Sequence, residues 1–138
     1  MLRFASAIAL ALSLAACAST GVPAERTVAV TGSIAYRERI ALPPTAQIEV
    51  RLDDVSRADA PATNMATQSF AGEGKQVPFA FTLTVDRADI DPRHRYAVSA
   101  RITDADGKLM FITDTRNSVT FDSRPAIDLG TLMLVKTH

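Results

Sequence analysis

The stretch VPFAFTLTV, residues 77–85, decides the fold. Its large apolar side chains stand at every second position, and alanine and threonine fill most of the positions between them. Because successive side chains of a β-strand point to opposite faces of the sheet, this period of two predicts a half-buried strand. The residues predicted to point into the core are Val77, Phe79, Phe81, Leu83 and Val85.

Other stretches extend the same pattern outward from this strand. IEVRL (48–52) and RYAVSARIT (95–103) alternate in the same way, and TVAVTGSIAY (27–36) is apolar and β-branched enough to form a strand. IDLGTLMLV (127–135) is apolar on both faces, which predicts a strand buried on both sides. We expect one core that contains Ile48, Val50, Leu52, Phe79, Phe81, Tyr96, Val98 and Ile102.

Turn residues separate these strands. Asp106-Gly107 tolerates positive φ and predicts a tight hairpin, and Gly32 and Gly74 are candidate bulge or turn positions. MATQSF (65–70) and VTF (119–121) are candidate edge strands. No long stripe of helical period follows the N-terminal region, so little helix is expected. About seven short strands joined by turns predict an all-β fold, an antiparallel β-sandwich of the immunoglobulin or transthyretin type.

The N-terminal residues have the proportions of a signal peptide. Arg3 precedes an apolar run that ends at Ala18, which is too short to span a bilayer comfortably. Leu14-Ala15-Ala16-Cys17 resembles the lipobox of bacterial lipoproteins, in which the cysteine thiol carries the lipid and the chain is cut just before it. The alternative is an ordinary signal peptide with an incidental Cys17, the one cysteine in the sequence.

The lipobox interpretation divides the chain into three parts. They are a signal peptide cleaved after residue 16, a lipidated tether at 17–27 and a β-sandwich domain at 28–138. The resemblance implies that the protein is attached through the lipid on Cys17 to the periplasmic face of an outer membrane, because Ala18 stands where an inner-membrane lipoprotein commonly has aspartate. Cleavage removes Arg3 from 15 basic and 15 acidic residues, which leaves a net charge of −1. That balance does not favour nucleic acid as a partner.

No motif in the sequence indicates catalysis or a cofactor. The two histidines, His94 and His138, are far apart, no serine has a Gly-x-Ser-x-Gly setting, and no cluster of metal ligands is visible. The run DADG (104–107) lacks the further oxygen ligands of a calcium loop. Arg87, Arg93 and Arg95 around His94 form a small basic patch that could contact phosphate or lipid headgroups, or simply a solvated loop.

Four segments together resemble the YbaY/YscW-type lipoprotein domain. They are VTGSIAYRERIALPP (30–44), AQIEVRLDDVSRADAP (46–61), GKQVPFAFTL (74–83) and YAVSARITDADGKLMFITD (96–114). The resemblance implies a β-sandwich and a cell-envelope lipoprotein. Members of this type in type III secretion act as pilotins, which are lipoprotein chaperones of an outer-membrane secretin.

Three functional hypotheses follow. The first is a non-catalytic binding or chaperone module for an envelope protein such as a secretin, with Tyr36, Arg37 and Arg39 as its candidate partner-binding residues beside Glu38. The second is a structural or stress-related envelope lipoprotein that binds cell-wall or saccharide material. The third is a small hydrolase, which would need His94 to face a nucleophile and an acid in a concave site.

Overall fold

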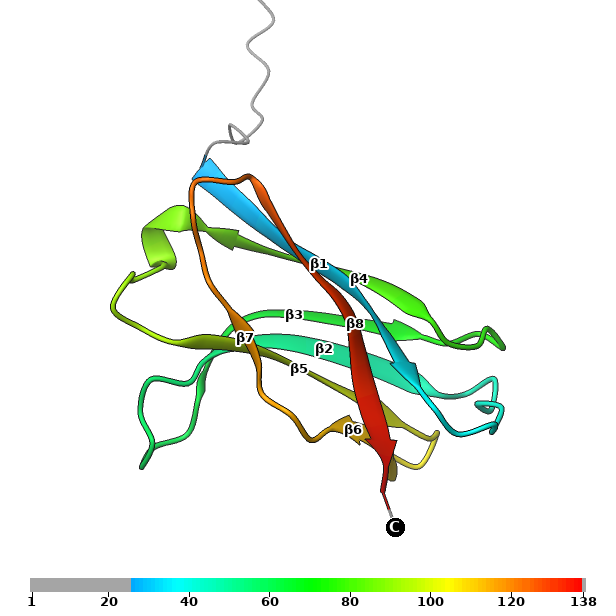
Figure 1. Cartoon of the computed structure of the whole chain (residues 1–138). Helices are drawn as coiled ribbons and strands as arrows, with labels where there is room; N and C mark the ends of the chain where they lie inside the picture. The colour runs from blue at the N-terminus through cyan, green and yellow to red at the C-terminus, as the bar shows by residue number, and fades with distance from the viewer. Residues whose placement is uncertain (1–25, 138) are drawn as a thin grey trace, which may run out of the picture.

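A computed structural model describes residues 26–137 and shows an all-β domain (Figure 1). Its strands are β1 (Thr27–Tyr36), β2 (Gln47–Asp54), β3 (Thr63–Ala71), β4 (Phe79–Asp86), β5 (Tyr96–Thr103), β6 (Leu109–Thr113), β7 (Asn117–Val119) and β8 (Ala126–Lys136). One short 3-10 helix, η2 (Arg87–Asp89), lies between β4 and β5. Within residues 26–137, no helix has the length and apolar character needed to cross a membrane.

All eight strands belong to one mixed sheet. The hydrogen-bonded order is β3-β2-β5-β6-β8-β1-β4, and β7 pairs with β5. Figure 1 shows β4, β1 and β8 crossing over β3, β2 and β5. The two edge strands come together: the Thr82 N–H of β4 donates to the Gln68 Oε1 of β3 at 2.9 Å, and Phe70 packs against Phe79 with ring centroids 5.8 Å apart. The sheet is therefore a nearly closed barrel.

The prediction of an antiparallel sandwich is wrong in its topology. The first strand, β1, and the last, β8, are parallel neighbours, with Ala29 paired to Ala126 and Tyr36 to Leu134. The pairing of β6 with β8 joins the two layers into one sheet. A period of two reports only which face of a strand is buried, so it does not reveal the neighbour of a strand or its direction.

The predicted glycine positions are confirmed at two points. The register of β1 against β8 shifts between Thr31 and Ser33, which places Gly32 in an irregularity of the ladder. A Cβ at Gly32 would lie 2.6 Å from the Gly130 carbonyl oxygen and 2.9 Å from the Phe81 ring, so no other residue fits there without a shift. Gly107 has φ of 80° in the hairpin that joins β5 and β6, as Asp106-Gly107 predicts.

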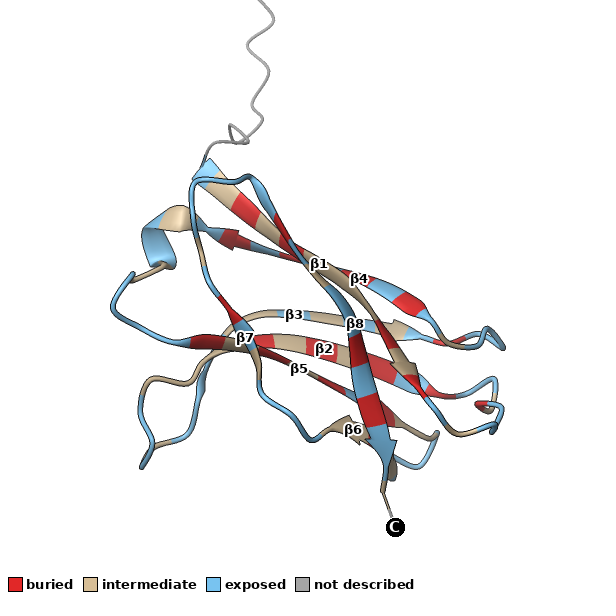
Figure 2. Cartoon of the chain, viewed as in Figure 1, coloured by how far each residue is buried: buried red, intermediate tan, exposed pale blue. Residues whose placement is uncertain are grey.

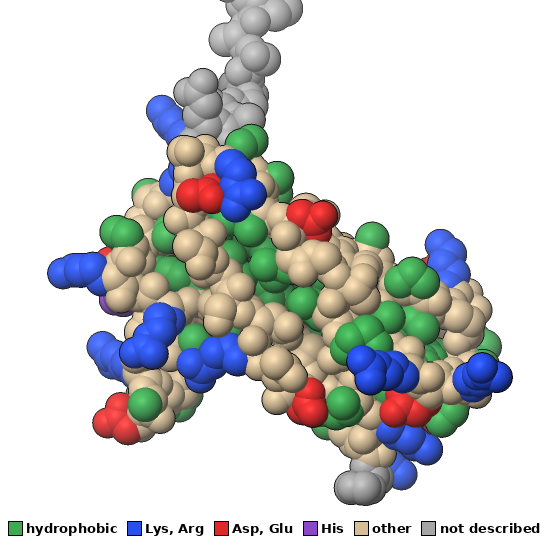
Figure 3. Space-filling view, viewed as in Figure 1, with side chains coloured by type: hydrophobic (Ala, Val, Ile, Leu, Met, Phe, Trp, Pro, Cys, Tyr) green, Lys and Arg blue, Asp and Glu red, His purple; other side chains and the backbone are tan. Residues whose placement is uncertain are grey.

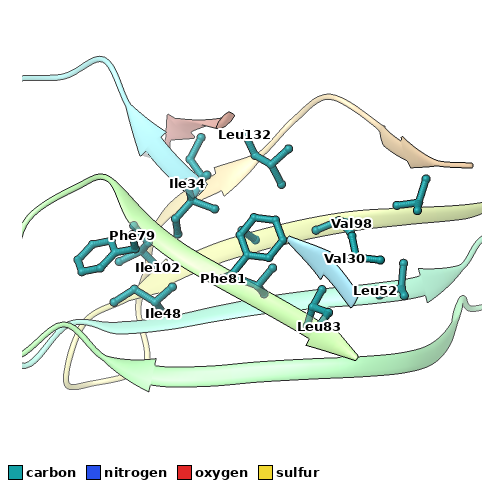
Figure 4. Close-up of a cluster of buried hydrophobic side chains, with 14 of the residues drawn as sticks. Val30, Ile34, Ile48, Leu52, Phe79, Phe81, Leu83, Val98, Ile102 and Leu132 are labelled. Atoms are coloured by element: carbon teal, nitrogen blue, oxygen red, sulfur yellow. The ribbon is translucent and has the colours of Figure 1, made fainter. Parts of the chain in front are cut away.

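The predicted core is confirmed. All eight residues expected in it are at most 7% exposed. β4 alternates strictly between buried and exposed residues, which Figure 2 shows as red and blue bands along the strand. In Figure 4, Phe81 lies among side chains from both layers, including Val30, Leu83 and Val98. The two layers thus share one apolar core.

The prediction that β8 is buried on both faces is wrong. Ile127, Leu132 and Leu134 point inward, but Met133 and Val135 are 37% and 36% exposed. Nothing within residues 26–137 covers the outer face of the sheet here, and the apolar character of β8 therefore reaches the surface.

The loops gather at the two ends of the barrel. The N-terminal end, where β1 begins, carries residues 55–62, 87–95 and 120–125, and the opposite end carries residues 37–46, 72–78 and 104–108 (Figure 1). The two ends differ in the side chains that they present.

Candidate binding site

A polar cluster forms at the N-terminal end around His94. Its Nδ1 lies 2.6 Å from Oδ2 of Asp54, the last residue of β2, and its Nε2 lies 3.6 Å from Asp91 Oδ2. The Ser56 hydroxyl donates to the other Asp54 oxygen, Oδ1, at 2.6 Å. Because β2 and β5 pair side by side, the end of β2 and the residues before β5 meet here. His94, for which the sequence shows no partner, thus has two carboxylates.

The carboxylates of this cluster are held in their charged form. The Ser56 hydroxyl, with smaller contributions from the Ser56 N–H and from His94, lowers the pKa of Asp54 below its usual 3.8. The Arg93 side chain and then the Arg93 N–H lower the pKa of Asp91 to about 2. The Arg93 guanidinium donates to Asp91 through Nε at 3.1 Å and through a terminal nitrogen at 3.0 Å. Arg93 therefore neutralises Asp91.

This cluster does not have the order of a catalytic triad. A triad places the serine hydroxyl against the histidine and the carboxylate behind the histidine, so that the histidine can accept the serine proton. Here Asp54 stands between Ser56 and His94. The arrangement orients His94 and fixes the loops, and it does not activate Ser56 as a nucleophile.

The predicted basic patch around His94 is only partly assembled. Arg87 reaches across to the loop before β8, where it donates to the Asp122 and Arg124 carbonyl oxygens at 2.8 and 2.6 Å. Arg93 is paired with Asp91. Of the three predicted arginines, only Arg95 has a guanidinium with no hydrogen bond or ion pair to residues 26–137. It lines a hollow next to the cluster.

This hollow has a volume of about 340 Å³. Its apolar lining includes Tyr96, Val119 and Phe121, and the Tyr96 and Phe121 rings pack edge to face with centroids 5.3 Å apart. Arg95 and Arg116 stand at its rim. Both also line a neighbouring hollow of about 250 Å³, together with Arg57. Arg57, Arg95 and Arg116 together form an arginine rim.

The rim side chains are exposed, and hydrogen bonds hold the backbone at Arg95 and the residue next to Arg116. The Arg95 N–H donates to Ser56 Oγ and the Arg95 carbonyl oxygen accepts from the Val55 N–H, both at 2.8 Å. Next to Arg116, the Asn117 side-chain amide donates to the Thr115 and Val98 carbonyl oxygens at 3.1 and 3.3 Å. In Figure 3, Lys and Arg side chains gather over this end of the molecule, at the left of the view.

The sequence-predicted partner residues lie at the opposite end. Tyr36 is only 7% exposed, its ring stacks on Phe111 at 4.0 Å between centroids, and its hydroxyl donates to the Ile40 carbonyl oxygen at 2.6 Å. Tyr36 therefore fixes the loop from inside and does not belong to an exposed patch. Arg37 and Arg39 are exposed and stay a prediction. Cys17 lies outside the described residues.

Sequence reasoning missed Arg57 and Arg116. They lie 38 and 21 positions from Arg95 in the sequence, in the loop after β2 and in the segment before β7. The signal that could have found them is the predicted adjacency of strand ends, because loops at one end of a barrel come together. No group of three His, Cys, Asp or Glu side chains suited to hold a metal ion occurs in residues 26–137.

Comparison with known proteins agrees with this architecture. The family model described as type III secretion system lipoprotein chaperone (YscW) matches residues 25–130. The uncharacterized lipoprotein YbaY of Escherichia coli (strain K12) is 37% identical over 155 positions, which cover 99% of this chain and 81% of YbaY. An alternative pilotin from the type II secretion system of Vibrio cholerae is 50% identical in sequence and matches in structure with a TM-score of 0.72, over 82% of this chain and 99% of that chain. The resemblance noted in the sequence is thus confirmed, and the chain belongs to the YscW family of lipoprotein chaperones.

Proposed function

We propose that this protein is a lipid-anchored, non-catalytic chaperone of the pilotin type, which binds an outer-membrane secretin. The observation that carries the proposal is the match to the Vibrio cholerae pilotin, which is 50% identical and is covered over 99% of its chain. At that identity the two domains share more than a fold, because half of the aligned positions keep the same residue. A shared binding role is the simplest account of that agreement.

The chemistry of the described surface supports binding over catalysis. The hollow at the N-terminal end has an apolar floor and a charged rim, which suits recognition of another molecule. The polar cluster beside it orients loops, and its serine faces a carboxylate instead of a histidine. A site of this kind holds a partner and provides no activated nucleophile.

The anchor in this proposal is the lipid on Cys17. Strand β1 begins at Thr27, ten residues after Cys17, so the chain between them reaches at most about 35 Å. Three acyl chains, as the lipoprotein resemblance implies, give stable attachment, because each buried methylene contributes about 0.8 kcal/mol. The domain would then stay close to the outer membrane, where a secretin is assembled.

The test is Cys17→Ser in the full-length precursor. We expect it to abolish acylation and lipoprotein-type cleavage, because the serine hydroxyl is a much poorer nucleophile than the thiol at neutral pH. The intact mass of the purified protein and membrane fractionation report both effects. Secretin multimers in the outer-membrane fraction report the chaperone role, and we expect them to fall with the loss of the anchor.

A version that starts at Ala18 behind an ordinary secretory signal is the matched control. It should fold and remain in the periplasm, because all eight strands lie at or after Thr27. A mature N-terminus other than Cys17, or Cys17 without added acyl mass, would contradict the anchor. Unchanged secretin multimers in cells that lack this protein would contradict the chaperone role.

A further inference from the structure

The arginine rim holds positive charge that the rest of the protein does not use. Arg93 and Arg124 are paired with Asp91 and Asp122, and Arg87 is bound to backbone carbonyl groups. Arg57, Arg95 and Arg116 make no side-chain hydrogen bond or ion pair with any residue from 26 to 137, and two adjacent hollows bring them together. Three unpaired guanidiniums around a concave surface favour an anionic ligand.

The ligand must also carry an apolar group. Tyr96, Val119 and Phe121 lie in the wall of the hollow below Arg95 and Arg116. A volume of about 340 Å³ is close to the lower limit of about 300 Å³ for small-molecule pockets, so the hollow holds about one large side chain and not a whole helix. Buried anchors of this kind carry much of the binding energy of protein interfaces.

The charge is local and does not extend over the whole end of the barrel. The carboxylates of Asp59, Asp89 and Asp114 lie on the same loops and line neither hollow. The one carboxylate that lines the larger hollow, that of Asp91, is paired with Arg93. The end as a whole therefore has little net charge, whereas attraction to an anionic membrane surface grows with the number of basic residues near that surface. A discrete acidic group that enters the hollow fits this distribution better than a lipid surface does.

We propose that this hollow and the arginine rim dock a short segment of the partner protein in which a large apolar side chain stands next to a carboxylate. The apolar side chain enters the hollow and packs against Phe121, and the carboxylate pairs with Arg95 and Arg116, with Arg57 within the same basic surface. This inference rests on the proposed function, because it takes the secretin as the protein that supplies the segment. The backbone of Arg95 is held by hydrogen bonds to Ser56 and Val55 before the partner arrives, so the loop that carries this arginine does not have to be ordered on binding.

The main experiment measures the binding of the acylated full-length mature protein, in detergent micelles, to the secretin of the same organism. The double variant Arg95→Glu/Arg116→Glu should bind at least about 10-fold more weakly, because both attractive contacts become repulsive. Arg37→Glu/Arg39→Glu tests the alternative site that the sequence predicts at the opposite end. The matched control is Lys75→Glu/Lys108→Glu, which has the same change of charge at that end and should bind like the wild type. All three pairs are exposed, so the melting temperatures should stay unchanged.

A peptide probe tests the hollow without the secretin. A capped six-residue peptide with phenylalanine followed by aspartate should shift the amide NMR signals of Tyr96, Val119 and Phe121. The same peptide with asparagine in place of aspartate, or alanine in place of phenylalanine, should shift them several-fold less at equal concentration. Phe121→Ser, which removes part of the apolar wall, should weaken the response of the first peptide.

The outcomes separate the two proposals. If the wild-type protein binds no secretin but the peptide shifts those signals, the proposed function fails and the site stands. Binding that is lost in the Arg37/Arg39 variant and kept in the Arg95/Arg116 variant would overturn the site and move it to the opposite end. Two further results would also overturn the proposed site. One is a loss of binding to phosphatidylglycerol vesicles in the Arg95/Arg116 variant with no loss of binding to the secretin. The other is a peptide that shifts none of the amide NMR signals of the hollow.

Discussion

The barrel has a hollow at each end, and the two differ in how they are built. The hollow at the N-terminal end, of about 340 Å³, draws its walls from the β2–β3, β4–β5 and β7–β8 loops and from β7, and its free charges are arginines. The hollow at the opposite end, of about 320 Å³, lies between Ile40 and the β5–β6 hairpin, with Lys108 and Lys136 beside Asp104. Lysine is depleted and arginine enriched at protein interfaces, which makes the first hollow the better binding surface.

The aromatic residues that line the two hollows also differ in how far the core depends on them. Phe111, which lines the hollow at the opposite end, is fully buried and stacks on Tyr36. In the hollow at the N-terminal end, Tyr96 and Val119 are also buried in the core, whereas Phe121 is only half-buried. The comparison teaches that an apolar wall of a hollow is free to bind a partner only where the core does not depend on it.

The largest expected effect is at the opposite end. Phe111→Ala should lower the free energy of unfolding by about 3–5 kcal/mol, because truncation of a buried phenylalanine loses transfer energy and leaves a cavity. That is a large part of a typical stability of about 5–15 kcal/mol. Urea unfolding followed by circular dichroism measures it. Phe121→Ala is the matched comparison. Equal losses of stability in the two variants would show that the core depends on Phe121 as much as on Phe111.

A smaller loss of stability is expected when the hydrogen bonds between the Gln76 side chain and the Leu42 backbone, at the opposite end, are removed. Gln76 in the β3–β4 loop accepts from the Leu42 N–H at 2.7 Å through Oε1 and donates to the Leu42 carbonyl oxygen at 3.3 Å through Nε2. Gln76→Ala leaves the backbone groups of the buried Leu42 without these partners, which should cost about 1–2 kcal/mol. Gln47→Ala is the control, since Gln47 is an exposed glutamine with no side-chain hydrogen bond to residues 26–137. Equal stabilities of the two variants would show that water replaces the two hydrogen bonds of Gln76.

The buried face of most strands could be predicted from the sequence, but the order and direction in which the strands pair could not. β2, β4 and β5 alternate because one of their faces meets the core, and this information is local. The pairing of β1 with β8 joins residues about 100 positions apart, such as Ala29 and Ala126, and no local pattern encodes it. For β8, the apolar outer face misled the prediction because hydrophobic composition alone does not say whether another layer covers a face.

The same limit applies to the candidate site. Arg95 and His94 could be singled out because they are neighbours in a basic turn, but Arg57 and Arg116 approach Arg95 only when the ends of β2, β5 and β7 come together. Tyr36 shows a second limit of sequence reasoning, because a sequence does not say which residues of a candidate patch are exposed. Tyrosine and arginine side by side predict an interface, but Tyr36 is the last residue of β1 and points into the core, whereas Arg37 follows the strand and is exposed.

The smallest expected effect on stability concerns the ion pair between Asp91 and Arg93. This pair engages the Asp91 carboxylate, which therefore does not compete with a partner for the arginine rim. The Arg93 side chain lowers the pKa of Asp91 to about 2 from the usual 3.8. A carboxyl group whose pKa is lower in the folded protein stabilises the fold above its unfolded pKa, and this contribution is lost as the pH falls from about 4 to about 2. Asp91→Asn removes it, so the stability difference from the wild type should be present above pH 4 and shrink toward zero at pH 2. The difference should be small, because the pair is exposed to solvent.

Two measurements test whether Arg93 is the residue that lowers the pKa of Asp91. Urea unfolding from pH 7 to pH 2 should show the described convergence for Asp91→Asn and not for Asp59→Asn, which changes an exposed carboxylate without a side-chain hydrogen bond to residues 26–137. In an NMR titration of the carboxyl carbons, Arg93→Ala should raise the pKa of Asp91 toward 3.8, because its main hydrogen-bond donor is gone. If the pKa of Asp91 stayed near 2 in Arg93→Ala and rose instead in Arg95→Ala or Arg116→Ala, the rim arginines would already be engaged by Asp91. The contrast between the two hollows would then disappear, since Arg95 and Arg116 would be no freer to bind a partner than Lys108 and Lys136 beside Asp104.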